Sequence, residues 1–194
     1  MISFPARRYA GYIFDCDGTL VDSMPLGHAA WRSAIASSGA SFDFTWELFL
    51  SRGGMGMEET VVELNAQFGE SMDPAQVAAD QRAYVWANVE TVQPIRPVVE
   101  FAGRVSRFAP CAVASGSERR IVDRQLEVVK IRDLFAAIVT PEDVERGKPH
   151  PDTLLRAAEL LGVPARECLV LEDSPLGQQA AFAAGMECLM VAPN

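Results

Sequence analysis

The sequence has 194 residues, of which 49% are hydrophobic and 22% are charged, and its formal net charge is −9. A chain of this length and composition can bury one good core and a small second lobe, which excludes an intrinsically disordered protein. The acidic balance also argues against a general nucleic-acid binder, since such proteins need a basic face to displace counterions from phosphates. We therefore expect a globular protein without a nucleic-acid partner.

The cysteines are spread along the chain and form no C-x-x-C pair, which indicates buried, reduced thiols. They are Cys16, Cys111, Cys168 and Cys188. Arg7 and Arg8 precede a short apolar stretch, but Asp15 interrupts it too early for a signal-peptide core, and no later run is long enough to span a bilayer. The sequence predicts a cytoplasmic protein without a membrane partner.

Short apolar runs that are typical of buried strands recur along the chain. They cover residues 12–14, 112–114, 137–139, 169–171 and 189–191. From the second run onward, a helical pattern lies between each run and the next, whereas a longer segment separates the first two runs. Such an alternation of strands and helices is typical of a parallel sheet. We therefore predict an α/β fold.

The segment between the first two runs contains several helical patterns, at residues 25–37, 46–50, 58–68 and 74–89. It predicts a helical insertion, and Pro94 and Pro97 mark the return of the chain because two prolines so close together restrict the backbone. We expect a core made of 1–22 and 92–194 with an inserted domain at 23–91. Large side chains such as Trp31, Phe44 and Trp46 are expected to form the small core of this insertion.

Carboxylates follow two of the predicted strands at the point where each strand ends. Asp15 and Asp17 follow the first run, and Glu172 and Asp173 follow the fourth. Open α/β sheets place their chemistry at this edge. Two like charges about 4 Å apart repel by roughly 4 kcal/mol at an effective dielectric near 20, so converging carboxylates need a cation. All the candidate ligands are oxygens, which favours Mg²⁺.

Lys148 and the segment 115–117 add groups that suit a phosphate. Lys148 provides positive charge, Ser115 provides a hydroxyl, and Gly116 lies in a turn whose backbone N–H groups open the following helix. Each of these motifs alone also fits an ordinary turn or helix cap. Their joint order, with one element after each of four strand-like runs, favours a shared metal and phosphate site.

In their order, the motifs resemble those of the haloacid dehalogenase-like phosphohydrolases. Motif one is Asp15-Cys16-Asp17-Gly18-Thr19, motif two is Ser115, motif three is Lys148, and motif four is Glu172-Asp173. The resemblance covers nearly the whole chain, and the motif spacing is similar to that of the β-phosphoglucomutase and sugar-phosphate phosphatase branch. It implies a Rossmann-like, three-layer α/β/α core with an inserted helical cap of the C1 type.

The same resemblance implies a Mg²⁺-dependent phosphatase that acts on a small phosphorylated metabolite, most simply a sugar phosphate. Asp15 would be the nucleophile that forms an aspartyl-phosphate, and Asp17 would be the general acid and base. Ser115 and Lys148 would hold the transferring phosphoryl group. The expected ligands of Mg²⁺ are Asp15, the main-chain carbonyl of Asp17, and Asp173 with Glu172 in support.

Further residues are expected to contact the substrate. Those in the core are Thr19, Gly116 and Ser117. In the cap, Arg52 and Gly53 match the position of the family's basic, glycine-containing specificity loop, and a mobile loop with a spare arginine is the alternative. For His28, a surface or packing role and a substrate role are equally supported, because related enzymes carry the cap histidine one position earlier, where this chain has Gly27.

Two other classes fit parts of the pattern. A mutase would use the same chemistry at Asp15 but return the phosphoryl group to another hydroxyl of the sugar. The Asp-x-Asp-Gly turn suggests a calcium-binding module, although the EF-hand spacing asks for an acid or Asn at Thr19 and for a Glu at Leu26. A haloacid dehalogenase is disfavoured because Asp17 suits phosphoryl transfer. The oligomeric state is left open, and a monomer is favoured.

Overall fold

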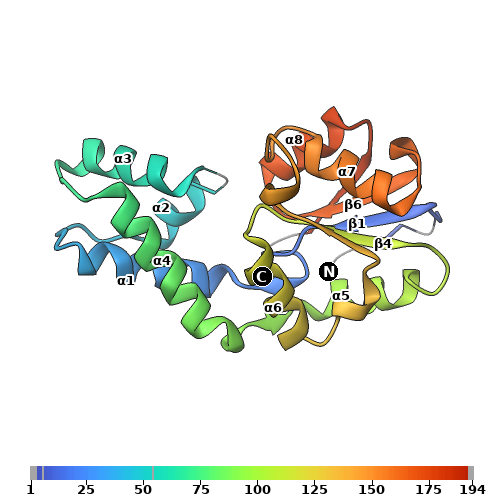
Figure 1. Ribbon diagram of the computed structural model, residues 1–194, viewed down its shortest axis with the longest axis horizontal. Helices are drawn as coiled ribbons and strands as arrows, with labels where there is room; N and C mark the ends of the chain where they lie inside the picture. Colours follow the sequence, from blue (N-terminus) through green and yellow to red (C-terminus); the bar gives the residue numbers. More distant parts are fainter. Residues whose placement is uncertain (1–3, 6, 54, 192–194) are drawn as a thin grey trace. The chain divides into compact units, whose positions relative to one another are not determined.

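The computed structural model describes residues 4–5, 7–53 and 55–191. The chain divides into two compact units, one made of the described residues up to Asp22 and from Val92 onward, the other of Ser23–Thr91. The first unit holds a five-stranded sheet, and the second is helical (Figure 1). None of the helices in these described ranges combines the length and the hydropathy needed to cross a bilayer.

The main sheet consists of five parallel strands in the order β5-β4-β1-β6-β7. They are β1 Gly11–Phe14, β4 Cys111–Ala114, β5 Ala137–Val139, β6 Cys168–Glu172 and β7 Glu187–Met190. β1 lies at the centre, where Tyr12 pairs with Cys111 of β4 and with Leu169 of β6. Its side chains are buried on both faces of the sheet, which explains why the run is continuously apolar.

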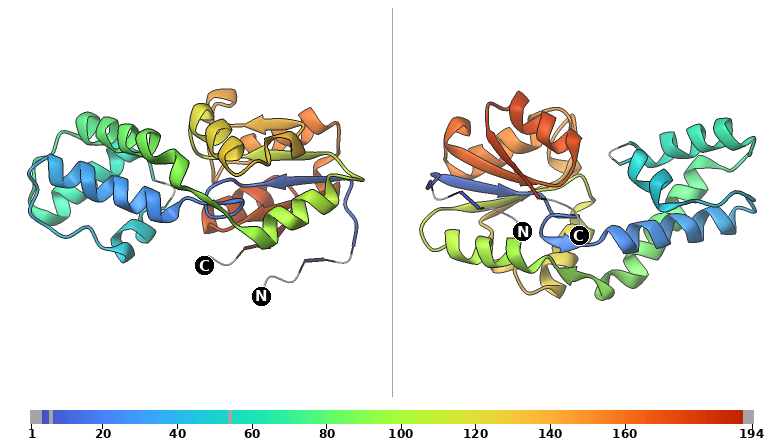
Figure 2. Two further views of the ribbon diagram at one scale, coloured as in Figure 1. Left: turned by 90° about the horizontal axis from the view of Figure 1, so that it is seen from below. Right: turned by 180° about the vertical axis from the view of Figure 1, so that it is seen from behind.

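Four helices cover the two faces of the sheet. They are α5 Arg96–Val105, α6 Arg119–Val128, α7 Asp152–Leu161 and α8 Pro175–Ala183. α7 and α8 lie on one face and α5 and α6 on the other (Figure 1), and the view from behind in Figure 2 shows the same three layers. Ile13 of β1 packs into the cluster that includes Leu154 of α7, whereas the ring of Tyr12 meets Phe101 of α5. The predicted parallel α/β sheet with helices on both faces is confirmed.

The helices form where apolar residues recur at helical spacing. α5 buries the residues at positions i, i+3, i+4 and i+7, namely Val98, Phe101, Ala102 and Val105. Pro97 occupies its first turn, where a missing N–H group loses no intrahelical hydrogen bond. Short 3₁₀ turns complete the connections: Val89–Thr91, Arg132–Leu134, Pro141–Asp143 and Ala165–Glu167.

A second, two-stranded antiparallel sheet lies at the ends of the helical insertion. β2 Val21–Asp22 pairs with β3 Gln93–Pro94, so that Val21 faces Pro94 and Asp22 faces Gln93. The N–H group of Ile95 adds a hydrogen bond to the carbonyl of Leu20 at 2.9 Å. The chain therefore leaves the core and returns to it at adjacent positions. The sequence did not predict this pair, because strands of two residues have no periodicity.

The helical unit contains α1 Met24–Ser37, α2 Trp46–Ser51, α3 Met57–Phe68 and α4 Pro74–Asn88. α4 packs against both α1 and α3. The unit has its own core of buried side chains, which includes Trp31, Ile35, Phe44, Leu64 and Val77. Trp46 is instead 38% exposed and packs against His28 and Phe49.

Candidate active site

Asp15 and Asp17 lie in the tight turn that follows β1. The N–H group of Asp15 donates to the carbonyl of Leu171 at 2.9 Å, so the sheet still holds the backbone of Asp15. Gly18 has a φ of +75°, and a Cβ atom there would overlap Oδ2 of Asp173. The turn therefore needs glycine both for its conformation and for the close approach of Asp173.

Lys148 connects the ends of β1 and β6. Its Nζ donates to Oδ1 of Asp15 at 2.7 Å and to Oε2 of Glu172 at 2.6 Å. The Lys148 side chain is only 10% exposed, so solvent and salt screen these two ion pairs little. Loss of the lysine would leave buried carboxylates without their cation.

Glu172 is held by the start of α8. Its Oε1 accepts a hydrogen bond from the hydroxyl of Ser174 at 2.8 Å and another from the N–H group of Ser174 at 3.3 Å. Gly177, in the first turn of α8, leaves room for this carboxylate, because a Cβ atom at Gly177 would overlap it. Both oxygens of Glu172 thus have partners, Oε2 with Lys148 and Oε1 with Ser174.

Asp15, Glu172 and Asp173 carry more negative charge than the single ammonium group of Lys148 can neutralise. Burial raises the pKa of Asp15 well above its usual range, and the charge of Glu172 raises it further, although Lys148 opposes the shift. Burial also raises the pKa of Asp173 to about 7, again with a contribution from Glu172. Burial alone would lower the pKa of Lys148, but Asp15 and Glu172 together raise it. One ammonium group therefore faces several carboxylates.

The loop after β4 holds Ser115 and Ser117. Ser115 is fully buried, and its Oγ accepts a hydrogen bond from the N–H group of Ser117 at 3.0 Å. The hydroxyl of Ser117 donates to Oδ2 of Asp17 at 2.7 Å. The side-chain amide of Gln125, from α6, donates to Oδ1 of Asp17 at 2.9 Å. Both oxygens of Asp17 are therefore hydrogen-bonded by the segment that runs from β4 into α6.

The remaining predicted residues of the core lie beside these groups. Thr19 is buried, and its Oγ1 lies 3.5 Å from Oδ1 of Asp173, at the outer limit of a hydrogen bond. Gly116 is exposed in the turn between the two serines of the β4 loop. Their contacts with substrate stay predictions.

His28 has a packing role within the helical unit. Its Nε2 lies 2.9 Å from the carbonyl oxygen of Phe44, and its ring packs edge-on against Trp46. A third aromatic ring, that of Phe49, lies 5.6 Å from the His28 ring between centroids. These contacts account for His28 structurally, and its substrate role stays a prediction.

Arg52 ends α2 and is tied to its own unit. Its guanidinium donates to the side chain of Gln67 and to Oγ of Ser51, the latter at 3.0 Å. Gly53 follows it in an exposed turn. The specificity-loop role of Arg52 and Gly53 also stays a prediction.

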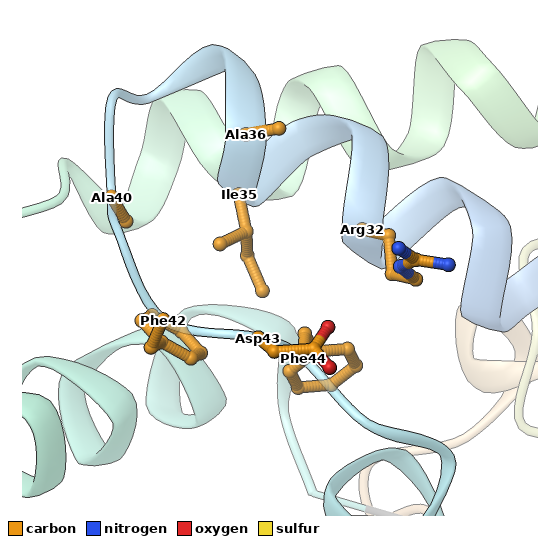
Figure 3. Close-up of a pocket in the computed structure, with 7 residues that line it drawn as sticks. All are labelled: Arg32, Ile35, Ala36, Ala40, Phe42, Asp43 and Phe44. Carbon is orange, nitrogen blue, oxygen red and sulfur yellow. The ribbon is translucent and has the colours of Figure 1, made fainter.

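A pocket of about 120 Å³ lies within the helical unit (Figure 3). Its lining residues are Arg32, Ile35, Ala36, Ala40, Phe42, Asp43 and Phe44. In the close-up, Ile35 points toward the rings of Phe42 and Phe44. The residues of this unit that are predicted to bind substrate do not line the pocket.

A family model described as haloacid dehalogenase-like hydrolase matches residues 12–191, which is nearly the whole chain. The chain belongs to the haloacid dehalogenase-like hydrolases. The resemblance inferred from the order of the motifs is confirmed, and so is the prediction of an enzyme from this family.

Named relatives of this haloacid dehalogenase-like chain act on sugar and hexitol phosphates. The chain is 34% identical to the fructose-1-phosphate phosphatase of Escherichia coli (strain K12), over 95% of this chain and 97% of that protein. It is 28% identical to hexitol phosphatase A of the same organism, over 96% of this chain and 84% of that protein. The crystal structure of CbbY from Rhodobacter sphaeroides in complex with phosphate matches with a TM-score of 0.80. That match has 22% identity over 93% of this chain and 84% of that chain, and it shows the fold alone.

The carboxylates of this haloacid dehalogenase-like site fit a divalent cation. Asp15, Glu172 and Asp173 each offer an oxygen, and these oxygens lie within 4.8 Å of one another. Hard oxygen donors with an excess of negative charge are the ligands that Mg²⁺ prefers. The carboxylate of Asp17 is outside this group, and its oxygens accept hydrogen bonds from Ser117 and Gln125. Its main-chain carbonyl remains the predicted ligand.

Two residues that shape this haloacid dehalogenase-like site were not predicted from the sequence. Gln125 lies among the buried apolar residues of α6, which are Ile121, Val122 and Leu126. A polar side chain on a buried helical face was a usable signal, but its partner Asp17 lies 108 positions away in the chain. The other residue is Gly177, a glycine inside a helical pattern, which often marks a close approach.

Proposed function

We propose that this protein is a Mg²⁺-dependent phosphatase that hydrolyses a small phosphorylated metabolite, most simply a sugar phosphate. The observation that carries this proposal is the ammonium group of Lys148 between Asp15 and Glu172, beside Asp173. The carboxylates can supply a nucleophile and the oxygen ligands of a cation. The ammonium group supplies positive charge for the oxygens of a phosphate. Similarity to a fructose-1-phosphate phosphatase and a hexitol phosphatase supports the sugar-phosphate class.

In the first half-reaction, Asp15 is the nucleophile. A carboxylate oxygen of Asp15 bonds to phosphorus while the bond between phosphorus and the sugar oxygen breaks. Asp17 gives its proton to the departing sugar oxygen, so that the sugar leaves as a neutral alcohol and an aspartyl-phosphate remains. Ser115 and Lys148 hold the other oxygens of the transferring group.

In the second half-reaction, Asp17 acts as a base. It takes a proton from water, the water oxygen bonds to phosphorus, and the bond between phosphorus and Asp15 breaks. Inorganic phosphate leaves, Asp15 is again a carboxylate, and Asp17 is again protonated. Mg²⁺ would be held by Asp15, the main-chain carbonyl of Asp17, and Asp173 with Glu172 in support. When bound, it supplies positive charge that screens the phosphoryl oxygens.

The two units correspond in this proposal to a catalytic core and an inserted cap. The core is 1–22 with 92–194, and the cap is 23–91. Substrate contacts come from Thr19, Gly116 and Ser117 of the core and from His28, Arg52 and Gly53 of the cap. We also propose a cytoplasmic location, which the four free thiols of the chain support.

A phosphate-release assay tests this function directly. Fructose 1-phosphate, hexitol phosphates and nucleoside monophosphates are offered with Mg²⁺ and then with EDTA. We expect release from the sugar and hexitol phosphates that exceeds release from nucleotides and is abolished by EDTA. The Asp15→Asn protein, purified in the same way, controls for contaminating phosphatases. Absence of release from every substrate, or release that EDTA leaves unchanged, would contradict the proposal.

A further inference from the structure

Gln125 is a buried glutamine whose side-chain amide is bonded at both ends. It is 1% exposed, in the middle of α6. Its Nε2 donates to Oδ1 of Asp17 at 2.9 Å, and its Oε1 accepts from the thiol of Cys16 at 3.2 Å. The amide therefore connects the two residues that follow Asp15 with the helix after β4.

The orientation of this amide follows from the chemistry of its neighbours. A carboxyl oxygen that carries no proton only accepts hydrogen bonds, so the nitrogen of the amide faces Oδ1 of Asp17. The oxygen then faces Cys16, which must donate. The S–H group of a thiol is a weak donor, and Sγ of Cys16 lies 3.2 Å from Oε1 of Gln125, so the thiol donates to the amide oxygen. Cys16 thus donates a hydrogen bond to Gln125, and Gln125 in turn donates one to Asp17.

Packing alone does not explain why position 125, on the buried face of α6, is a glutamine. Its neighbours on the buried face of α6 are Ile121, Val122 and Leu126. An amide withdrawn from water gains nothing over an apolar side chain of the same shape unless its hydrogen bonds compensate for the lost solvation. Here the stronger of those bonds ends on a charged group, Asp17.

Ser117 and Gln125 differ in the hydrogen bonds that they can make with Asp17. The hydroxyl of Ser117, on Oδ2, can donate or accept a hydrogen bond. The amide N–H of Gln125, on Oδ1, can only donate. Oδ1 therefore accepts a hydrogen bond in either protonation state of Asp17, and Oδ2, whose partner can also accept, is the oxygen better suited to carry a proton.

On the basis of the phosphatase function proposed above, we propose that Gln125 is a positioning residue for Asp17. It fixes the plane of the carboxyl group through Oδ1 and leaves Oδ2 as the oxygen that gives the proton to the leaving group. Gln125 itself touches no reacting atom. Its contribution is the orientation of the acid, and it is largest where the leaving group most needs a proton.

The test compares leaving groups in Gln125→Met, which keeps the length of the side chain and removes the amide. With fructose 1-phosphate, whose sugar alkoxide is a poor leaving group, we expect kcat to fall ~10- to 100-fold. With p-nitrophenyl phosphate, whose leaving group needs little protonation, we expect a loss below ~3-fold. KM for both substrates should stay within about twofold of wild type, because Gln125 is buried.

Gln81→Met is the matched control. Gln81 is the other buried glutamine among the described residues, and it lies in α4 of the helical unit. Its substitution should change kcat equally for the two substrates. If Gln125→Met does not fold, Gln125→Asn withdraws the amide by one methylene group and should give the same dependence on the leaving group. Thermal unfolding of each variant separates loss of fold from loss of positioning.

A double-mutant cycle completes the test. In the Asp17→Asn background, Gln125→Met should cause little further loss with fructose 1-phosphate, because both changes disable the same acid. Equal losses on the two substrates, or fully additive losses in the cycle, would overturn the positioning role while the wild-type activity stands. A wild type that releases phosphate from neither substrate would overturn the proposed function itself.

Discussion

The Nζ of Lys148 lies 2.7 Å from Oδ1 of Asp15, and the same ammonium group reaches Glu172 at the end of the neighbouring strand. One cation therefore neutralises charge from two strand ends. The pKa values of Asp15 and Asp173 are nevertheless raised, which shows that a single lysine does not compensate the whole cluster. The stability and the activity of the protein should both depend on this balance.

Loss of Lys148 should be costly at alkaline pH. Lys148→Met leaves Asp15 and Glu172 buried without their cation, and we expect the free energy of unfolding to fall by roughly 3–5 kcal/mol at pH 8. The loss should be smaller at pH 5, because burial raises the pKa of Asp15 and this carboxyl group can then take up a proton. We also expect kcat to fall at least ~100-fold. Denaturant titration at both pH values measures the first effect.

Lys130→Met is the control for that variant, because Lys130 is the other lysine of the chain and is exposed. It should change neither stability nor turnover appreciably. Equal destabilisation by the two substitutions would show that the ion pairs of Lys148 do not matter.

Asp15→Asn should abolish turnover while it preserves the fold. The substitution keeps the size of the side chain and removes the nucleophilic carboxylate, so we expect a loss of at least ~1,000-fold in kcat. Circular dichroism checks the fold. Asp133→Asn, at an exposed aspartate, should retain full activity. Turnover by Asp15→Asn within tenfold of wild type would exclude Asp15 as the nucleophile.

Gly177→Ala should disturb the site through direct contact with Glu172. The added Cβ atom would overlap the carboxylate of Glu172, which must then move away from Lys148. We expect a loss of about 1–3 kcal/mol in the free energy of unfolding, typical of overpacking, together with reduced kcat.

The control for this change is Gly103→Ala in α5, where no heavy atom of the described residues lies within 4 Å of an added Cβ atom, apart from its chain neighbours and the backbone of its own helix. Alanine should stabilise that helix by about 0.5–1 kcal/mol. If both variants gain stability, Glu172 does not occupy the space beside Gly177.

Mg²⁺ should stabilise the protein more at pH 8 than at pH 5. The pKa of Asp173 is about 7 in the folded, metal-free protein and about 3.9 in an unfolded chain. As the pH rises between these values, the unfolded chain releases the proton first, so this group progressively destabilises the fold. A bound cation removes that penalty and competes with protons at low pH.

The measurement is the Tm with EDTA and with Mg²⁺ at the two pH values. Asp173→Asn should reduce both the pH dependence of the metal-free protein and the gain from Mg²⁺. An equal gain from Mg²⁺ at pH 5 and pH 8, unchanged in Asp173→Asn, would contradict the assignment of this metal site.

β-Glucose 1-phosphate, supplied with a bisphosphate primer, should yield mainly free phosphate. A mutase must hold the far phosphate of a bisphosphorylated intermediate and therefore needs several basic donors. Here the residues 53–57 that follow Arg52 contain no basic side chain. Both products are followed in one reaction. Rapid formation of glucose 6-phosphate without phosphate release would establish a mutase.

The sequence predicted the sheet and the residues at its edge because both depend on local patterns. Asp15, Lys148 and Glu172 each follow an apolar run, and the carboxyl ends of parallel strands meet at one edge. Gln125 could not be placed in the same way, since its partner is determined by how α6 packs on the sheet. The ladder of β2 with β3 was missed because it has only two residue pairs. His28 could not be assigned either, because a histidine at helical spacing suits packing and binding equally.

The short ladder between β2 and β3 makes the helical insertion a replaceable module. Asp22 and Gln93 face each other in that ladder. The Cα atoms of such partners are roughly 5 Å apart, a span that a tight hairpin turn can close. Removal of 23–91 would therefore require no change in the order of the five parallel strands, and another segment could be grafted between the same two residues. Under the function proposed above, exchange of this one segment would alter which substrates are accepted, while the carboxylates and the lysine at the sheet edge would stay in place.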